Sequence, residues 1–253
     1  MLNNFGGKIT QLFAEIGEVS ILLKNILLNF RHILKDRRLF FEQAVRLGFN
    51  SLPLVILVGF FTGAVSAWQA NYQFQNYLPS KYLGFAVYKA VVIELAPVLT
   101  GLVIAGRVSA SIAAELGSMK VTEQIDALES LAIDPVRFLA MPRVSAMTFL
   151  MPVLTVLSGF VAVVGGVLVA MIFMNIGWYT FFVEVPPNFK IYDFFVAFTK
   201  ALTFGGITSL MGCYIGMSTV GGAEGVGKAT IQAFVWSSIL ILMSDYILAT
   251  ILF

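Results

Sequence analysis

Residues 105–143, AGRVSASIAAELGSMKVTEQIDALESLAIDPVRFLAMPR, separate two long apolar runs and decide the fold of this chain. In the first half of this stretch, small residues recur every four positions in two adjacent series. One series is Ala105, Ser109, Ala113 and Gly117, and the other is Gly106, Ala110, Ala114 and Ser118. Small residues at this spacing let the backbone of a second helix approach closely, which is how helices associate in lipid. The first half therefore predicts a membrane helix with a closely packed face.

The second half of this stretch predicts a short helix outside the membrane, which we call the elbow (residues 118–143). Thr122 is the expected N-cap, and Asp134–Pro135 is expected to end the helix and start another turn. We expect the acidic side chains to point outward and the apolar ones to face a partner protein. The residues expected at that contact are Glu123, Gln124, Ile125, Asp126, Leu128, Glu129, Asp134 and Pro135. The alternative interpretation is an ordinary solvated loop.

The composition places the chain among membrane proteins. Of its 253 residues, 58% are hydrophobic and 12% are charged, whereas soluble domains are about 25% charged. Several apolar runs exceed the ~20 residues that cross a bilayer. We predict an all-α polytopic membrane protein with a single domain, residues 1–253. Its spans are expected at about 47–70, 86–117, 144–174, 192–218 and 230–253.

The first 46 residues predict an amphipathic helix that lies on the membrane surface. Glu15 and Glu18 interrupt any apolar core, which excludes a signal peptide. The basic run RHILKDRR at 31–38 suits anionic lipid headgroups. A soluble helix packed on a partner is the alternative interpretation. The apolar side is expected to contain Ile9, Leu12, Phe13, Ile16, Leu23, Ile26, Leu27 and Phe30.

The distribution of basic residues predicts the orientation in the membrane. Segment 1–46 contains seven Lys or Arg residues and segment 107–143 contains four. The loops at 71–85 and 175–191 contain only Lys81 and Lys190. Because cytoplasmic loops are enriched in Lys and Arg, we expect the N-terminus and the elbow in the cytoplasm and the C-terminus outside it.

The sequence gives no indication of catalysis. It contains neither HExxH nor GxSxG. Its single histidine, His32, lies outside every predicted span, and its single cysteine, Cys213, excludes an intrachain disulfide and a cysteine metal site. The segment GAEGVGKAT at 222–230 approaches a phosphate-binding loop, but Ala229 replaces the hydroxyl residue that binds magnesium. We therefore expect no enzyme, metal site or cofactor, and a tight glycine turn at this segment.

Three charged residues are predicted within the outer half of the bilayer. Glu94, Lys200 and Asp245 each lie about 10–12 Å from the outer end of their span. Because a charge facing lipid is costly, we expect the three to face the protein interior. Two interpretations stay open: a polar layer that contacts a lipid headgroup beside a cavity, and a buried ion-pair network that ties spans together.

Four apolar residues on the first span follow helical spacing: Phe61, Val65, Trp68 and Tyr72. Packing, or an aromatic belt at the membrane interface, is the default explanation. A cavity at a dimer interface, lined by spans one, two and five, would give some of them contacts with acyl chains.

Three segments together resemble the MlaE/YrbE family of ABC-transporter permeases. They are ELAPVLTGLVIAGRVSASIAAELGSMKVTEQIDALESLAIDPVRFLAMPR (94–143), GGAEGVGKAT (221–230) and SLPLVILVGFFTGAVSAWQ (51–69). The similarity extends from about residue 40 to the end. It implies a homodimeric permease of the bacterial inner membrane, with a separate ATPase subunit that binds ATP and magnesium. It also implies a periplasmic MCE-domain protein and, often, a small STAS-domain subunit. The implied substrate is glycerophospholipid, moved between the inner and outer membranes to maintain outer-membrane lipid asymmetry.

The energetics of lipid transfer agree with that role. Each buried CH₂ contributes ~0.8 kcal/mol, so extraction of two acyl chains into water costs tens of kcal/mol. Such transport needs an apolar path and an energy source, and this chain contains no ATPase motif of its own. A secondary transporter or channel is the rival, but it predicts inverted halves, and five spans do not divide equally. A scaffold without a transport role would leave the polar layer unexplained.

Overall fold

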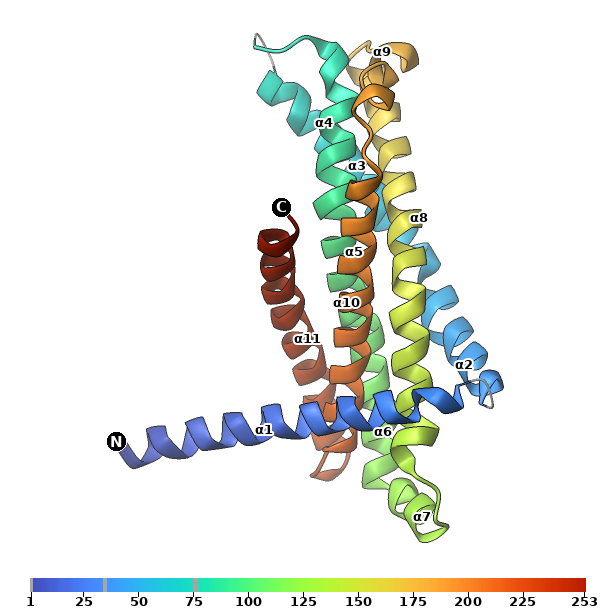
Figure 1. Cartoon of the computed structure of the whole chain (residues 1–253), viewed down its shortest axis with the longest axis vertical. Coiled ribbons are helices and arrows are strands. Elements are labelled where there is room, and N and C mark those ends of the chain that lie inside the picture. The colour runs from blue at the N-terminus through green and yellow to red at the C-terminus, as the bar shows by residue number, and fades with distance from the viewer. Residues whose placement is uncertain (1, 34–35, 75–76) are drawn as a thin grey trace.

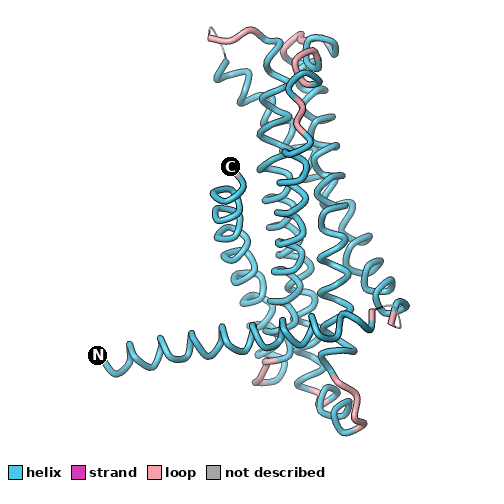
Figure 2. The backbone as a smooth tube through the Cα atoms, viewed as in Figure 1, coloured by secondary structure: helices cyan, strands magenta, loops and turns pink. Residues whose placement is uncertain are grey.

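Five long helical runs make up most of the chain (Figure 1). The computed structural model describes residues 2–33, 36–74 and 77–253, and every regular element in these ranges is a helix (Figure 2). The runs are Arg37–Phe74, Ser80–Val121, Val136–Phe173, Ile191–Met217 and Gly222–Leu252. Each is long and apolar enough to cross a membrane. The predicted all-α architecture with five spans is therefore confirmed.

The first two runs each join several helical segments. The first consists of α2 (Arg37–Gln43), a π turn (Ala44–Gly48), a 3-10 turn (Phe49–Ser51) and α3 (Leu52–Phe74). The second consists of α4 (Leu83–Ala90), α5 (Ala96–Ile104) and α6 (Ala110–Val121), joined by π turns at Val91–Leu95 and Ala105–Ser109. Glu94 lies in the first of these π turns and Arg107 in the second. Both π turns thus present a charged side chain, in keeping with the frequent occurrence of such turns at functional sites.

The remaining runs are simpler. After the elbow helix α7 (Gln124–Ser130), a π turn (Val136–Ala140) leads into α8 (Met141–Phe173). The short α9 (Trp178–Phe182) precedes α10 (Ile191–Met217), and α11 (Gly222–Leu252) ends the chain. α10 lies at the centre of the bundle, where it packs against α6, α8 and α11. Its Ala201 and Phe204 are fully buried in the main core.

α3 and α8 pack backbone against backbone. A Cβ on Gly63 would overlap the backbone of Ala162, and a Cβ on Gly59 would lie 2.7 Å from the Ser158 carbonyl oxygen. From the other side, a Cβ on Gly165 would overlap the Phe60 backbone. The absence of side chains at these positions is therefore what allows the two spans to approach each other.

The first small-residue series is buried within the chain itself. Ala105, Ser109 and Ala113 have no exposed surface. A Cβ on Gly212 of α10 would lie 2.9 Å from the Ser109 carbonyl oxygen, and one on Gly216 would lie 3.1 Å from Ala113 Cα. The Ser109 hydroxyl also lies 2.9 Å from the Ser237 hydroxyl of α11. The predicted close packing is present, but it joins helices of one copy, so this series is not available to pack against a second copy.

The rest of that prediction concerns Gly117 and Ala110. Gly117 is buried against Thr219, whose Oγ1 would lie 2.9 Å from an added Cβ. Ala110, from the second series, is only partly buried, and Gly106 and Ser118 of the same series are exposed. The second series is thus the one that remains open toward the surroundings of the chain.

Two expected boundaries were wrong near the last span. The fifth span begins at Gly222, not at residue 230, and contains Gly225 and Gly227 within its helix. The turn before it lies at Gly221 and Gly222, whose φ angles are +90° and +68°. Only glycine adopts such angles without strain. The glycines that we assigned to one turn are therefore divided between a turn and the first part of a helix.

α1 (Leu2–Asn29) lies across the bundle rather than along it (Figure 1). Ile26 is buried in the main core, and Glu18 accepts a hydrogen bond of 2.9 Å from the Tyr214 hydroxyl of α10. Phe13, Ile16, Leu23, Leu27 and Phe30 are exposed, whereas the side chains of Ile9 and Leu12 lie outside the described residues. A helix with exposed apolar side chains, crossing a bundle of spans, is suited to the membrane surface, and this location stays a prediction.

Candidate functional site

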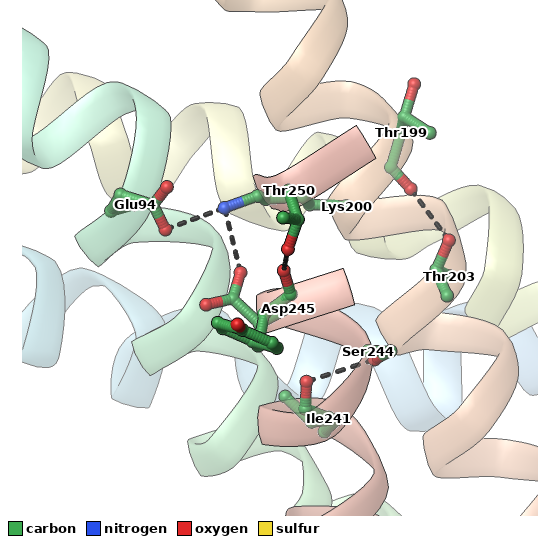
Figure 3. A network of polar contacts seen from close by, with 9 residues as sticks. Glu94, Thr199, Lys200, Thr203, Ile241, Ser244, Asp245 and Thr250 are labelled. Atoms are coloured by element: carbon green, nitrogen blue, oxygen red, sulfur yellow. Dashed lines mark hydrogen bonds and ion pairs between the residues drawn. The ribbon is translucent and has the colours of Figure 1, made fainter. Parts of the chain in front are cut away.

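Lys200 lies between two carboxylates from different spans (Figure 3). Its ammonium donates a hydrogen bond of 2.6 Å to Glu94 Oε2 and forms an ion pair of 2.9 Å with Asp245 Oδ1. The latter contact lacks hydrogen-bond alignment, and Asp245 Oδ1 is buried without another partner among the described residues. The second, fourth and fifth spans therefore meet at this ion-pair cluster, which we call the polar layer.

Exposure differs strongly within the polar layer. The Lys200 side chain is 0% exposed, that of Asp245 is 19% exposed and that of Glu94 is 42% exposed. Two carboxylates face one ammonium, so the cluster has a surplus acceptor when both are ionised. The ion-pair interpretation thus describes Lys200 and Asp245, while Glu94 also presents acceptor oxygens outside the bundle. Both interpretations from the sequence remain compatible with this geometry.

A second polar cluster was missed by the sequence analysis. Asp193, at the start of α10 and 2% exposed, accepts a hydrogen bond of 2.5 Å from Lys89 of α4. The Tyr88 hydroxyl lies 3.5 Å from the same carboxylate oxygen. Opposite charges near the same end of two predicted spans were the signal that could have found it. This cluster fastens α4 to α10, beyond the polar layer as seen from the elbow.

The predicted aromatic face of α3 is exposed. Phe61, Val65, Trp68 and Tyr72 are between 56% and 67% exposed, and the Trp68 ring contacts that of Phe173 edge-on, with centroids 6.0 Å apart. None of the four lines the large groove of the structure. In a single copy, these side chains form an outward apolar surface, which suits contact with lipid or with another helix.

The large groove lies on a different side, between α8 and α10. It has a volume of about 650 Å³ and is almost entirely apolar. Its lining includes Val92, Pro152, Phe160, Val164, Phe194 and Phe198. The groove cannot be predicted from the sequence, because it depends on how far neighbouring helices diverge and not on the apolar pattern of each one.

The elbow helix differs from the prediction at its beginning. α7 begins at Gln124, and Thr122 closes α6 instead, with its hydroxyl donating to the Ser118 carbonyl oxygen at 2.8 Å. The expected N-cap was therefore wrong. The Thr122 hydroxyl forms its hydrogen bond with the preceding turn and does not cap α7. The residue directly before α7 is Glu123, which has a φ of +60°.

The elbow helix also ends differently. Ile133 N–H donates to the Leu128 carbonyl oxygen and Ala132 N–H to that of Glu129, at 3.0 and 2.9 Å. With Ala132 at φ +58°, these are the hydrogen bonds of a Schellman motif. Ala132 thus lies beyond the last helical residue of α7. The new helical turn after Asp134 is present, since Asp134 Oδ1 accepts a hydrogen bond of 2.9 Å from Val136 N–H.

The apolar residues expected to face a partner face this chain instead. Ile125 is 3% exposed and belongs to the main core, and Leu128 is half-buried against it. Pro135 is also buried, whereas Glu123, Gln124, Asp126, Glu129 and Asp134 are exposed. The outward direction of the acidic residues is therefore confirmed and that of Ile125 was wrong. A seven-residue helix offers only one apolar face, and the bundle occupies it.

Other apolar side chains of the elbow remain exposed. Leu131 is 71% exposed, Phe138 44% and Ile133 39%. They follow α7 and were not assigned from the sequence, because their direction depends on the Schellman motif at Ala132. They give the elbow an apolar tip beside an acidic helix, which is a suitable surface for a protein partner.

The elbow is held in place by the N-terminal segment. Arg137 donates to Asp36 Oδ2 at 3.0 and 3.1 Å. Asn29 Nδ2 lies 3.3 Å from Asp134 Oδ2, and Lys120 pairs with Asp126 at 2.7 Å. These contacts link α1, α2 and α6 to the elbow, so the tip is presented on a positioned base. Across the described residues, no group of three His, Cys, Asp or Glu side chains is arranged to hold a metal.

The family called Permease MlaE matches residues 40–251 of the chain. The chain belongs to the MlaE permease family. A probable ABC transporter permease protein of Rickettsia typhi is 39% identical, with 99% of this chain and 97% of the relative covered. One from Synechocystis is also 39% identical, with 88% and 86% covered. The intermembrane phospholipid transport system permease protein MlaE of Haemophilus influenzae is 31% identical, with 100% and 99% covered.

Membership of the MlaE family agrees with the architecture described above. The match includes all five runs except for residues 37–39 of the first and Leu252 of the last. It excludes the whole of α1, which also lies outside the resemblance seen in the sequence. An MlaE permease is a membrane subunit of an ABC transporter and is not itself a catalyst.

Proposed function

We propose that this chain is the permease subunit of an ATP-driven transporter that moves glycerophospholipids between the inner and outer membranes. The polar layer is the observation that carries this proposal. A fully buried lysine between two carboxylates within the spans is costly in lipid, and half-exposed Glu94 leaves acceptors for a polar headgroup. The relative from Haemophilus influenzae, named as an intermembrane phospholipid transport permease, supports the substrate class. The role is to maintain the lipid asymmetry of the outer membrane.

ATP hydrolysis is assigned to a separate ATPase subunit, which also binds ATP and magnesium. The exposed tip at Leu131, Ile133 and Phe138 and the acidic side chains of α7 supply its docking surface. Apolar groups give buried area at such a contact and the charges fix its register. The relatives named as ABC transporter permeases support this assignment. Motion of the ATPase would reach the spans through the elbow.

The assembly that we propose contains two copies of the chain. One copy exposes the apolar face of α3 and most of α11. In the most apolar 18-residue stretch of α11, only 11% of the residues are buried. A second copy would cover such surfaces and enclose a two-chain lipid. A periplasmic MCE-domain protein, and in some systems a small STAS-domain subunit, complete the complex. The complex that we propose lies in the bacterial inner membrane, with the N-terminus of this chain in the cytoplasm and its C-terminus in the periplasm.

Reconstitution tests the proposed function. The chain and its copurified ATPase are placed in vesicles with fluorescent phospholipid, and ATP-dependent transfer to acceptor particles is measured. We expect transfer with ATP, and none with an ATPase that cannot hydrolyse it. Transfer that needs no ATPase would support a secondary transporter or channel instead. Absence of any lipid transfer by a complete, folded complex would refute the proposal.

A further inference from the structure

Arg107 is a charged residue that the polar layer does not use. It lies in the π turn Ala105–Ser109, 13 residues from Glu94 and eight from Glu115. At 1.5 Å per residue, it is about 20 Å from the polar layer and about 12 Å from the level of Glu115. Because Glu94 lies about 10 Å from the outer end of span two, Arg107 lies about 30 Å from it, at the elbow-side boundary of the hydrocarbon core.

The surroundings of Arg107 contain too few acceptors. Its Nη1 donates a hydrogen bond to the hydroxyl of Ser51, which itself donates to the Leu47 carbonyl oxygen at 2.6 Å. Throughout the described side chains, Arg107 forms no ion pair with a carboxylate. A guanidinium has five donors and a fixed charge. One serine hydroxyl leaves most of those donors, and all of the charge, uncompensated.

Neighbouring charges do not compensate it either. Toward the elbow, Glu115 Oε1 pairs with both Arg46 and Arg143, at 2.8 and 3.0 Å. That carboxylate is shared by two guanidinium groups, so the cluster has a surplus positive charge before Arg107 is added. Together, the three arginines and Glu115 have a net charge of +2. This cationic stripe rises from the elbow end of the bundle to Arg107.

The side of Arg107 is open to its surroundings. Its side chain is only partly buried, and Ser111, one turn closer to the elbow, is exposed. At this boundary, the phosphate groups of the elbow-side leaflet are within reach of a charged side chain. A phosphate diester of a membrane lipid has the matching charge and enough oxygens for two parallel hydrogen bonds from the fork. Its acyl chains remain in the hydrocarbon while its headgroup contacts the stripe.

We propose that Arg107 binds the phosphate group of a phospholipid drawn from the leaflet on the elbow side. The lipid's headgroup would lie about 12 Å above the level of Glu115, at the elbow-side boundary of the hydrocarbon and about 20 Å from the polar layer. This inference rests on the proposed function, because it gives the transported lipid a first binding position. Free phosphate would carry the same chemistry but has no acyl chains to hold it at the boundary of the hydrocarbon, so we commit to the lipid.

Photocrosslinking at Ser111 tests this site. The full chain, with benzoylphenylalanine at Ser111, is expressed with its partners in cells grown on ³²P-phosphate, irradiated, and purified. We expect covalent phospholipid label, and about tenfold less of it in Arg107→Gln, as the loss of a charge-assisted hydrogen bond predicts. Arg107→Lys should keep an intermediate amount, since the charge remains without the fork. Equal labelling in wild type and Arg107→Gln would overturn the site.

Two controls exclude a structural explanation. Ser51→Ala removes the hydroxyl but leaves the guanidinium, so label at Ser111 should stay or rise. A loss equal to that of Arg107→Gln would mean that Arg107 only fastens the first span. The second control places the photoreactive residue at Val153, on the exposed side of α8 and outside the groove. Its label reports bulk lipid and should not respond to Arg107→Gln.

The outcome separates this inference from the proposed function. Arginine-dependent label without ATP-driven transfer would support the site and refute transport. Transfer with arginine-independent label would support transport and overturn the site. In a parallel sample that is purified before irradiation, excess inorganic phosphate should leave the lipid label unchanged. Loss of the label there would show that Arg107 binds the free ion in preference to a lipid headgroup, which would overturn the lipid assignment.

Discussion

The Lys200 ammonium on α10 lies 2.6 Å from the Glu94 carboxylate on the second span, across a sequence separation of 106 residues. Lysine is the fully buried partner and glutamate the half-exposed one. Because of this asymmetry, we expect replacement of Lys200 and replacement of Glu94 to change the free energy of unfolding by different amounts. Loss of the lysine leaves two carboxylates facing each other, whereas loss of the glutamate leaves Lys200 paired with Asp245.

Lys200→Met should therefore destabilise the protein more than Glu94→Gln. Breaking a buried pair by removing one partner costs roughly 3–5 kcal/mol. Glu94→Gln should cost less, because a neutral amide needs no cation beside it and Lys200 keeps its ion pair with Asp245. Thermal unfolding of the purified protein in detergent measures both. Lys228→Met is the matched control, because Lys228 and Glu224 form an exposed pair worth at most about 0.5 kcal/mol. An equal loss in all three variants would contradict the asymmetry.

Exchange of charges tests what the polar layer does. The double variant Lys200→Asp with Asp245→Lys restores an ion pair in the opposite direction. Recovery of both unfolding temperature and lipid transfer would support a purely structural pair. Recovery of unfolding temperature alone would support a direct role with lipid, because the charge seen by a headgroup has moved. The assay is unfolding in parallel with ATP-dependent transfer.

Gly63→Ala should disrupt the packing of α3 on α8. The added methyl group would overlap the Ala162 backbone, which cannot move as a flexible side chain can. Overpacking of this kind typically costs about 1–3 kcal/mol, and more where backbone must shift. Gly227→Ala is the control, because nothing lies within 4 Å of its added Cβ. It should stabilise α11 by up to about 1 kcal/mol. Unfolding temperatures that fall together would refute this account.

Leu131→Asp should reduce ATPase binding while leaving the fold intact. The side chain is 71% exposed, so a charge there costs little until a partner covers it. Ile125→Asp should instead lower the unfolding temperature, because that position is buried in the core. Copurification of the ATPase and thermal unfolding distinguish the two effects. Ile191→Asp, at an 80% exposed position at the end of α10 far from the elbow, should change neither. Normal copurification with Leu131→Asp would exclude the tip from the contact.

Val65→Cys should form a disulfide-linked dimer in the membrane if the exposed face of α3 meets a second copy. The native Cys213 is 0% exposed and does not compete for oxidation. Mild oxidation followed by non-reducing electrophoresis gives the result. Phe160→Cys, on the groove side of α8, should remain monomeric under the same conditions. A dimer band from Phe160→Cys alone would place the interface on the other side of the bundle.

The sequence was sufficient where the bilayer dictates the answer. Apolar runs long enough to cross it gave five spans. The cost of charge in lipid indicated that Glu94, Lys200 and Asp245 would turn inward, which Lys200 and Asp245 do, whereas Glu94 is 42% exposed. Their meeting follows from the same cost, since a lysine among apolar helices has no other strong partner. The small-residue series likewise predicted close packing of the second span against another helix, but it did not show that this helix would be α10.

The elbow could not be predicted in the same detail, because local preference and packing compete there. Thr122 has a side chain that can cap a helix, but its hydroxyl donates a hydrogen bond to the preceding turn. Ile125 is on the apolar face of α7, and that face packs against the bundle and not against a partner. Ala132 ends α7 in a conformation that sequence rules assign to glycine. The groove between α8 and α10 is a property of helix divergence, which no single-segment pattern contains.

Span two is an unbroken helical run of 42 residues from Ser80 to Val121, about 63 Å long. That is about twice the thickness of the hydrocarbon core. The elbow adjoins one end of this run, and the ion pair between Lys89 and Asp193 lies near the other end. Arg107 and Glu94 lie between these two points. Such a rod acts as a lever arm: a tilt of about 5° about one end displaces the other by about 5 Å. A small push on the elbow would thereby become a movement as wide as a helix radius on the far side of the bilayer.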